Sequence, residues 1–139
     1  MSGTTNTGLV GYVSNDINVY PSNSITIDIF GNTFYRNYEY GMGDDTGALW
    51  SNENMYNQYH MLYLTSVISK SLNGKFDYSH KLRSSKIKSI EVHLPTTENG
   101  KPDLDFMELF IRAQQKLTIQ NLTQWRTKNI ELAKQVIST

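Results

Sequence analysis

The sequence predicts an α+β fold, in which a small mixed sheet is followed by one long C-terminal helix. Ile25, Ile27 and Ile29 alternate with polar residues, which is typical of a strand with one buried and one solvated face. Residues 59–68 are apolar nearly all round, which indicates a helix buried on more than one side. After Pro102, apolar residues recur at intervals of three or four, which indicates a further helix.

Length and composition narrow the function class. A chain of 139 residues is expected to form one domain with a modest core. It carries 13 basic and 13 acidic residues, so its overall charge does not indicate nucleic acid. The absence of cysteine excludes disulfides and thiolate metal sites, and no run approaches the roughly 20 apolar residues of a membrane span. No signal-peptide pattern is present, so we expect a cytoplasmic protein with no membrane partner.

The charge is unevenly distributed along the chain. Before residue 55 the acidic residues outnumber a single basic residue, Arg36, whereas residues 70–88 are rich in lysine and arginine, with Asp77 as their one acid. A local basic segment of this kind can bind phosphates. It can equally be a solvated loop, and both interpretations stay open.

A β-hairpin is the central feature of the N-terminal half. Residues 9–13 are expected to form a short strand before it. Gly31 and Asn32 separate the isoleucine strand from residues 33–40, and a Gly-Asn pair in this setting is typical of a tight hairpin turn. The second arm carries four aromatic rings, Arg36 and an amide, which are groups that stack on bases and read their edges. Packing in an ordinary sheet is the competing interpretation of the rings.

The polar loop at residues 41–47 contains the adjacent carboxylates Asp44 and Asp45. Paired carboxylates can hold a metal ion or act as acid and base, but no histidine or third carboxylate has the spacing that would complete such a site. Turn formation is therefore favoured, and no metal site is expected. Short strands are predicted at residues 48–50 and, from alternating apolar residues closed by a proline, at residues 90–94.

The buried helix is expected to begin with a cap on Asn52 or Asn54 and to run to about Leu72, where an Asn-Gly pair would end it. His60 lies in its apolar stretch, so we expect a packed histidine rather than a metal ligand.

The C-terminal helix is expected to begin near Pro102, with Asp103 and Asp105 suited to the positive end of its dipole. If unbroken, it would be about 55 Å long at about 1.5 Å per residue. A first apolar stripe is predicted to pack on the globular body and consists of Phe106, Phe110, Ala113 and Leu117.

A second stripe on this helix is out of phase with the first by at least one residue, or about 100° of rotation. It consists of Leu122, Trp125, Asn129, Leu132 and Val136. An exposed apolar stripe would be a liability, so a partner helix is the expected cover, with Asn129 as a polar position that could fix the register. The alternatives are a helix that bends near residues 118–121 or one that folds back on its own domain.

Several segments, taken in order, resemble one known family. They are GLVGYV at residues 8–13, NSITIDIFGNTFYRNY at residues 23–38, VHLP at residues 92–95 and NGKPDLDFMELFI at residues 99–111. The chain thereby resembles the specificity subunits of type I restriction–modification enzymes over nearly its whole length. The resemblance implies a non-catalytic protein that recognises double-stranded DNA by sequence and needs no cofactor.

In that family, a mixed α/β target-recognition domain is followed by a long helix. The resemblance therefore implies such a domain at residues 1–101, lacking its usual N-terminal segment, and a spacer or dimerisation helix at residues 102–139. One domain corresponds to half of a full subunit, so we expect a homodimer or a pairing with a second specificity half. The implied partners are a DNA methyltransferase subunit and a restriction (nuclease–translocase) subunit.

Matching positions give the residues expected to contact DNA. They lie ahead of the first strand, on the hairpin, and in or beside the basic segment: Thr4, Thr5, Asn6, Asn32, Tyr35, Arg36, Tyr38, Lys75, Tyr78, Lys81, Arg83 and Lys86. Two other functions stay open. One is an interaction module that binds methyltransferase subunits through its helix without reading DNA, and the other is an enzyme that uses Asp44 and Asp45.

Overall fold

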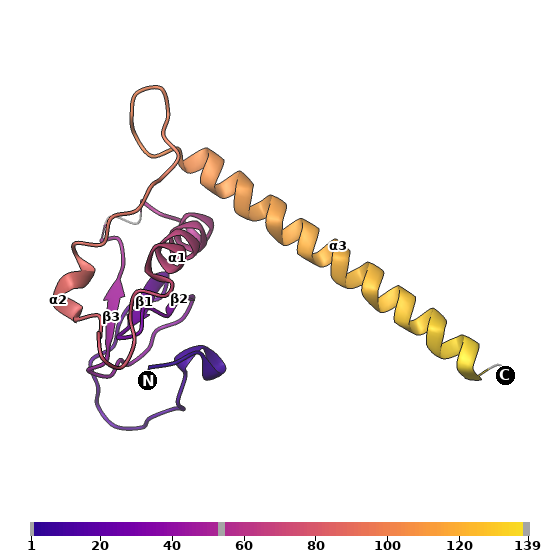
Figure 1. The fold of residues 1–139 in the computed structure, drawn as a ribbon, viewed down its shortest axis with the longest axis horizontal. Coiled ribbons are helices and arrows are strands. Elements are labelled where there is room, and N and C mark those ends of the chain that lie inside the picture. The colour runs from indigo at the N-terminus through magenta and orange to yellow at the C-terminus, as the bar shows by residue number, and fades with distance from the viewer. Residues whose placement is uncertain (1, 53–54, 138–139) are drawn as a thin grey trace.

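Strand β1 (Ser24–Asp28) is the centre of a three-stranded sheet with the order β2-β1-β3. β2 (Thr33–Arg36) and β3 (Thr46–Leu49) both pair with β1. The structure is a computed structural model that describes residues 2–52 and 55–137 (Figure 1). It confirms the predicted α+β class, the hairpin and the short strand after the polar loop. Both strand pairings in the described part of the chain are antiparallel, so the sheet is not mixed.

β1 is buried on both faces, whereas the sequence predicted one solvated face. Ile25 and Ile27 lie in the main hydrophobic core with residues of α1 (Gln58–Leu72). Thr26 and Asp28 belong to the opposite face and are only 3% and 4% exposed. Thr26 Oγ1 accepts a hydrogen bond from Arg36 Nε at 3.0 Å, and the Asp28 carboxylate accepts from backbone N–H groups. These polar residues are therefore buried with their hydrogen bonds satisfied.

The hairpin loop covers residues 29–32, so it is longer than the two-residue turn that the Gly-Asn pair predicted. Gly31 has a φ of 80°, which glycine adopts readily, and its N–H donates to the Asp28 carbonyl oxygen. Asp28 Oδ1 accepts from the N–H groups of Phe30 and Asn32, both at 2.9 Å. The carboxylate of Asp28 thus organises the loop around itself.

Helix α1 begins later than predicted, because its N-cap is Asn57 rather than Asn52. Asn57 Oδ1 accepts from the N–H groups of Tyr59 and His60, and His60 Nδ1 accepts from the Asn57 N–H, which completes a capping box. The other predicted cap, Asn54, lies outside the described residues. The helix ends at Leu72 as predicted, and its packing against β1, β2 and α3 confirms burial on more than one side. His60 is buried, as expected.

Two predicted strands are wrong. Residues 9–13 form no strand, and Val10, Tyr12 and Val13 are largely exposed. Residues 90–94 form no strand either, although the side chains of their isoleucine and valine pack against the core. Alternating burial therefore arises here in an extended segment that has no neighbouring strand to pair with. The sequence analysis also missed α2 (Ser84–Ile87), a short helix in the basic segment.

Helix α3 (Leu104–Ile137) confirms the long C-terminal helix; its 34 residues span about 51 Å at about 1.5 Å per residue. Asp103 Oδ1 accepts from the Phe106 N–H at 2.9 Å and so caps its start. The predicted first stripe was out of phase by one residue. The side chains buried against the body are those of Met107 and Ile111, whereas Phe106 and Phe110 are 48% and 44% exposed and contact the Tyr63 ring edge-on.

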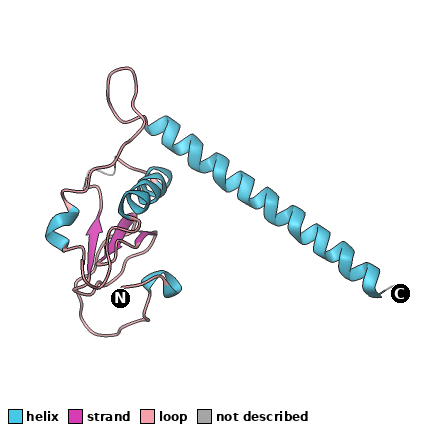
Figure 2. Ribbon diagram, viewed as in Figure 1, coloured by secondary structure: helices cyan, strands magenta, loops and turns pink. Residues whose placement is uncertain are grey.

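The second stripe is exposed along its length in the single chain. Leu122, Trp125, Leu132 and Val136 are between 49% and 77% exposed. Leu122 lies about 20° around the helix from Ile111, because eleven steps of about 100° exceed three full turns by about 20°. The stripe therefore continues the same helix face that packs on α1. α3 is unbroken and extends away from the sheet (Figures 1 and 2), so neither a bend nor folding back occurs in the described residues.

Candidate nucleic-acid interface

The hairpin loop and the basic segment, which are far apart in the sequence, lie side by side. The Leu82 N–H donates to the Ile29 carbonyl oxygen at 2.8 Å. The rings of Phe30 and Tyr78 are in contact, with their centroids 5.0 Å apart. We call the surface formed by residues 29–32 and 75–86 the tip face. The fold thus joins two features that the sequence analysis had associated with DNA for separate reasons.

The tip face presents several unpaired cations. Lys75, Lys81, Arg83 and Lys86 are exposed, and none of the four forms an ion pair within the described part of the chain. The one acid of the segment, Asp77, folds the loop: its Oδ1 accepts from the N–H of Ser79 and from that of His80. The hydrogen bonds from Ser79 and His80 lower the pKa of Asp77 below its ordinary value. Free cations beside a flat exposed ring suit phosphates and bases.

The N-terminal segment is attached to the sheet at two points. The Gly3 N–H donates to Asp28 Oδ2 at 2.7 Å, and Arg36 Nη2 donates to the Thr7 carbonyl oxygen at 2.6 Å. Between these points lie the exposed residues Thr4, Thr5 and Asn6. The segment is thereby held beside Asp28, the residue that organises the hairpin loop.

Arg36 was expected to lie on an accessible arm of the hairpin, but the structure buries it. Its side chain is 8% exposed and donates to Thr26, to the Tyr38 hydroxyl and twice to Thr7. The guanidinium carbon also lies 5.3 Å from the centre of the Phe34 ring. In the described structure Arg36 positions the N-terminal segment, and a contact between Arg36 and DNA stays a prediction.

The other hairpin residues differ in accessibility. Tyr38 is 40% exposed. Tyr35 is half-buried toward α1, donates its hydroxyl to Asn23 Oδ1 at 3.0 Å, and has its pKa raised by burial. Asn32 is half-buried, and its Nδ2 donates to Asp28 Oδ2 at 2.8 Å. The hairpin therefore offers Tyr38 most directly to a ligand.

Sequence reasoning missed the two residues that assemble this region. Asp28 was assigned to a solvated strand face, yet it holds both the hairpin loop and the start of the chain. Asp28 stands three residues before Gly31, and aspartate at the first position of a β-turn with glycine at the fourth is a known turn signal, so that signal was available. Phe30, the ring that contacts Tyr78, carried no signal in the sequence because its partner is distant along the chain.

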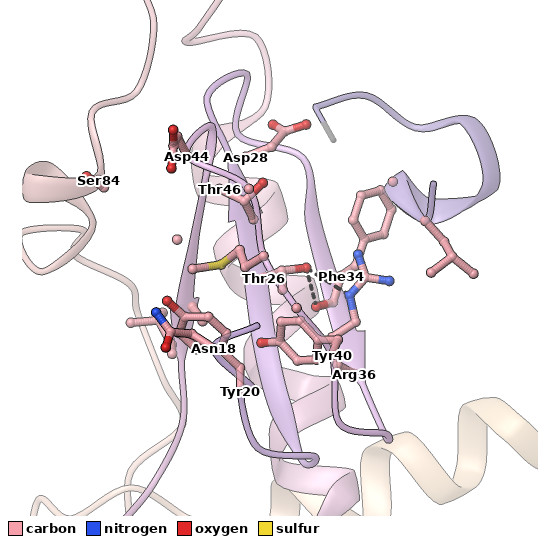
Figure 3. Close-up of a pocket in the computed structure, with 18 of the residues that line it drawn as sticks. Asn18, Tyr20, Thr26, Asp28, Phe34, Arg36, Tyr40, Asp44, Thr46 and Ser84 are labelled. Carbon is pink, nitrogen blue, oxygen red and sulfur yellow. Dashed lines mark hydrogen bonds between the residues drawn. The ribbon is translucent and has the colours of Figure 1, made fainter. Parts of the chain in front are cut away.

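A cleft of about 1090 Å³ lies on the sheet face opposite α1 (Figure 3). Thr26, Phe34 and Arg36 lie along it, with stacked Tyr20 and Tyr40 toward one end, their ring centres 5.8 Å apart. Asp44 lies toward the other end, but no group of three His, Asp or Glu side chains in the described residues is arranged to hold a metal ion. Asp45 is exposed and its backbone carbonyl accepts from the Ile29 N–H.

A comparison of the chain with known protein families finds a family that matches most of its length. Residues 1–124 match the family described as "Type I restriction modification DNA specificity domain", which confirms the resemblance. The chain belongs to this family. The matched region of this specificity domain includes both the tip face and the first part of α3.

Among curated proteins, the chain is similar to "Type II restriction enzyme BgcI specificity subunit S.BcgI" of Heyndrickxia coagulans. The two are 24% identical over 123 residues, which are 86% of this specificity domain and 36% of that protein. The chain therefore spans about a third of the length of its relative. No solved structure matches the chain. None of the helices in the described ranges is long and apolar enough to cross a membrane.

Proposed function

We propose that this specificity domain recognises one half of a DNA target through the tip face and the adjoining N-terminal segment, and catalyses no reaction itself. The observation that carries the proposal is the junction of the hairpin loop with the basic segment, fixed by the 2.8 Å bond from the Leu82 N–H to the Ile29 carbonyl oxygen. Exposed cations there would neutralise phosphates and fix the position on the duplex. Thr4, Asn6 and Tyr38 would contact base edges.

The assembly is a further part of the proposal. The exposed stripe on α3 would pack against a helix of a second copy or of another specificity half, so that two domains read a bipartite target. A DNA methyltransferase subunit would bind this pair, and a nuclease–translocase subunit would join for cleavage. The size of the exposed stripe supports this part, because four of its five side chains are large and apolar.

An interaction module that binds partners without reading DNA is the second candidate. It is favoured by the same exposed stripe on α3 and by the absence of a net positive charge. An affinity measurement for duplex DNA at several salt concentrations separates the two. If the chain binds duplex DNA through phosphate contacts, the logarithm of its affinity for DNA should fall linearly with the logarithm of the salt concentration. Undetectable DNA binding at low salt, by a folded chain, would favour the interaction module.

A further inference from the structure

Helix α3 is held to the body of the domain only near its start. Met107 and Ile111 are 0% and 9% exposed, and every described residue of α3 beyond Ile111 is exposed. Where α1 and α3 separate, a groove opens that is lined by Leu62, Ser66, Gln114 and Thr118 among others. The direction of the exposed part of α3 is therefore set by contacts within its first turns.

A polar cluster stands beside these apolar contacts. Glu108 Oε2 accepts from Asn57 Nδ2 at 2.6 Å, and Glu108 Oε1 accepts from Arg112 Nε at 2.7 Å. His60 Nε2 lies 3.8 Å from Glu108 Oε2, and the Arg112 guanidinium lies 4.1 Å from the centre of the Tyr59 ring. We call these five residues the Glu108 cluster. Tyr59 and His60 belong to the first turn of α1, and Asn57 is its N-cap.

The two kinds of contact constrain the helix differently. Met107 and Ile111 are one turn apart on the same line along α3, and Phe106 and Phe110 to one side of it contact the Tyr63 ring edge-on. Apolar contacts are not directional, so by themselves they let the helix roll and tilt. Hydrogen bonds depend on direction as well as distance, and those to an ionised carboxylate are stronger than neutral ones. Because Glu108 lies to one side of the apolar line, its bond to Asn57 at the start of α1 opposes such motion. Arg112 belongs to α3 itself, so its bond to Glu108 holds the carboxylate in place, and its own link to α1 is the contact with the Tyr59 ring.

We propose that the Glu108 cluster fixes the direction of α3 relative to the sheet, and that Glu108 is thereby a positioning residue for the distance between two DNA half-sites. The second part rests on the proposed function. From Arg112 to Lys134 the helix extends about 33 Å at about 1.5 Å per residue. A tilt of about 10° at Arg112 moves Lys134 by about 6 Å, close to the rise of two base pairs at about 3.4 Å each.

The distance between two spin labels tests the orientation directly. The chain has no cysteine, so Lys70→Cys on α1 and Lys134→Cys on α3 can be labelled selectively in the full chain. Dilution with unlabelled chain restricts the measurement to distances within one molecule. We expect one narrow distribution for the otherwise unmodified chain, and a distribution broadened or shifted by about 5 Å or more for Glu108→Ala.

Two further variants make this result specific. Alanine favours helix, so Glu108→Ala should not weaken α3 itself, and circular dichroism checks this. Glu131→Ala removes an exposed glutamate of the same helix and should leave the distribution unchanged. Arg112→Gln, which removes the charged partner, should broaden it. A distribution for Glu108→Ala that equals that of the unmodified chain, or equal broadening by Glu131→Ala, would overturn the proposal.

A DNA-binding measurement tests separately whether Glu108 affects the distance between two half-sites. Duplexes that carry two selected half-sites at different separations should show one preferred separation for the unmodified chain and a much weaker preference for Glu108→Ala, while affinity for a single half-site stays the same. A uniform loss at all separations and at the single half-site would overturn the spacing role. If the unmodified chain binds no DNA, the proposed function and the spacing role both fail, whereas the label distances still decide the orientation.

Discussion

Arg36 Nη2 donates a hydrogen bond of 2.6 Å to the backbone carbonyl oxygen of Thr7, 29 residues earlier in the chain. Thr7 has a φ of 53°, which a β-branched residue rarely adopts. Such a conformation persists only where surrounding contacts impose it. Arg36 therefore supports the strained N-terminal segment that carries three of the residues expected to contact DNA.

We predict that Arg36→Ala destabilises the domain and loosens its N-terminal segment. The substitution removes buried hydrogen bonds made by a charged group, which are worth about 1.5–3 kcal/mol. The free energy of unfolding in urea should fall by about that amount, and amide hydrogen exchange should increase in residues 3–8. Arg126→Ala, which removes an exposed arginine of α3, is the control. Unchanged exchange in residues 3–8 of the Arg36 variant would show that the segment is held by other contacts.

We predict that the basic segment contacts phosphates. Replacing Lys81 and Arg83 with alanine should reduce the slope of the log–log salt dependence of DNA binding by about two, and equally for all sequences. The matched control replaces Lys116 and Arg126 of α3, which are exposed and distant from the tip face, and should leave the slope unchanged. If instead only one particular sequence loses affinity, these two side chains read bases.

The main secondary structure could be predicted because local signals determine it. The glycine before Asn32 fixes the hairpin, the Asn-Gly pair ends α1, and the regular apolar spacing gives α3. The failures share a cause. Residues 9–13 and 90–94 have the alternation of strands, but pairing requires a neighbouring strand that local sequence does not report.

The candidate site could be predicted only in its parts. The exposed cations of residues 75–86 and Tyr38 were identified from composition and resemblance. Their assembly depends on contacts between distant residues, such as Phe30 with Tyr78 and Gly3 with Asp28. The burial of Arg36 has the same origin, because its partner Thr7 belongs to η1 (Thr5–Gly8), a short 3-10 turn that no local pattern of the sequence predicts.

We predict that α3 associates with another helix through its exposed stripe. Each large apolar side chain that becomes buried contributes about 1.5–3 kcal/mol. A variant with both Trp125→Glu and Leu132→Glu should therefore be monomeric by analytical ultracentrifugation, while the rest of the domain stays folded. Leu109→Glu, at a site that is 67% exposed and about 160° around α3 from Ile111, should not affect association. A concentration-independent monomer for the unmodified chain, with or without the proposed methyltransferase partner, would refute the interface.

We predict that acid releases the Glu108 cluster. Hydrogen bonds from Asn57 and Arg112 lower the pKa of Glu108, and the charged groups that face it are Arg112 and, when protonated, His60. A carboxyl with a lowered pKa stabilises the folded state above its ordinary pKa and loses that contribution as pH falls through the lowered value. The difference in unfolding free energy between the unmodified chain and Glu108→Gln should therefore be present at neutral pH and vanish in acid. A difference that is the same at both would contradict the ionised state of Glu108 as its source. Asp77 also has a lowered pKa, but it is present in both proteins, so its contribution cancels in the difference between their unfolding free energies.

Selection from a pool of random duplexes by the full chain tests the central claim most directly. If the tip face and N-terminal segment read DNA, the bound fraction becomes enriched in one short motif, and a single mismatch in that motif weakens binding by about 1–3 kcal/mol. Asn6→Ala should change the preferred base at one position while the salt slope stays the same. A pool that stays random after repeated rounds, although the chain is folded and binds duplex DNA, would contradict the claim.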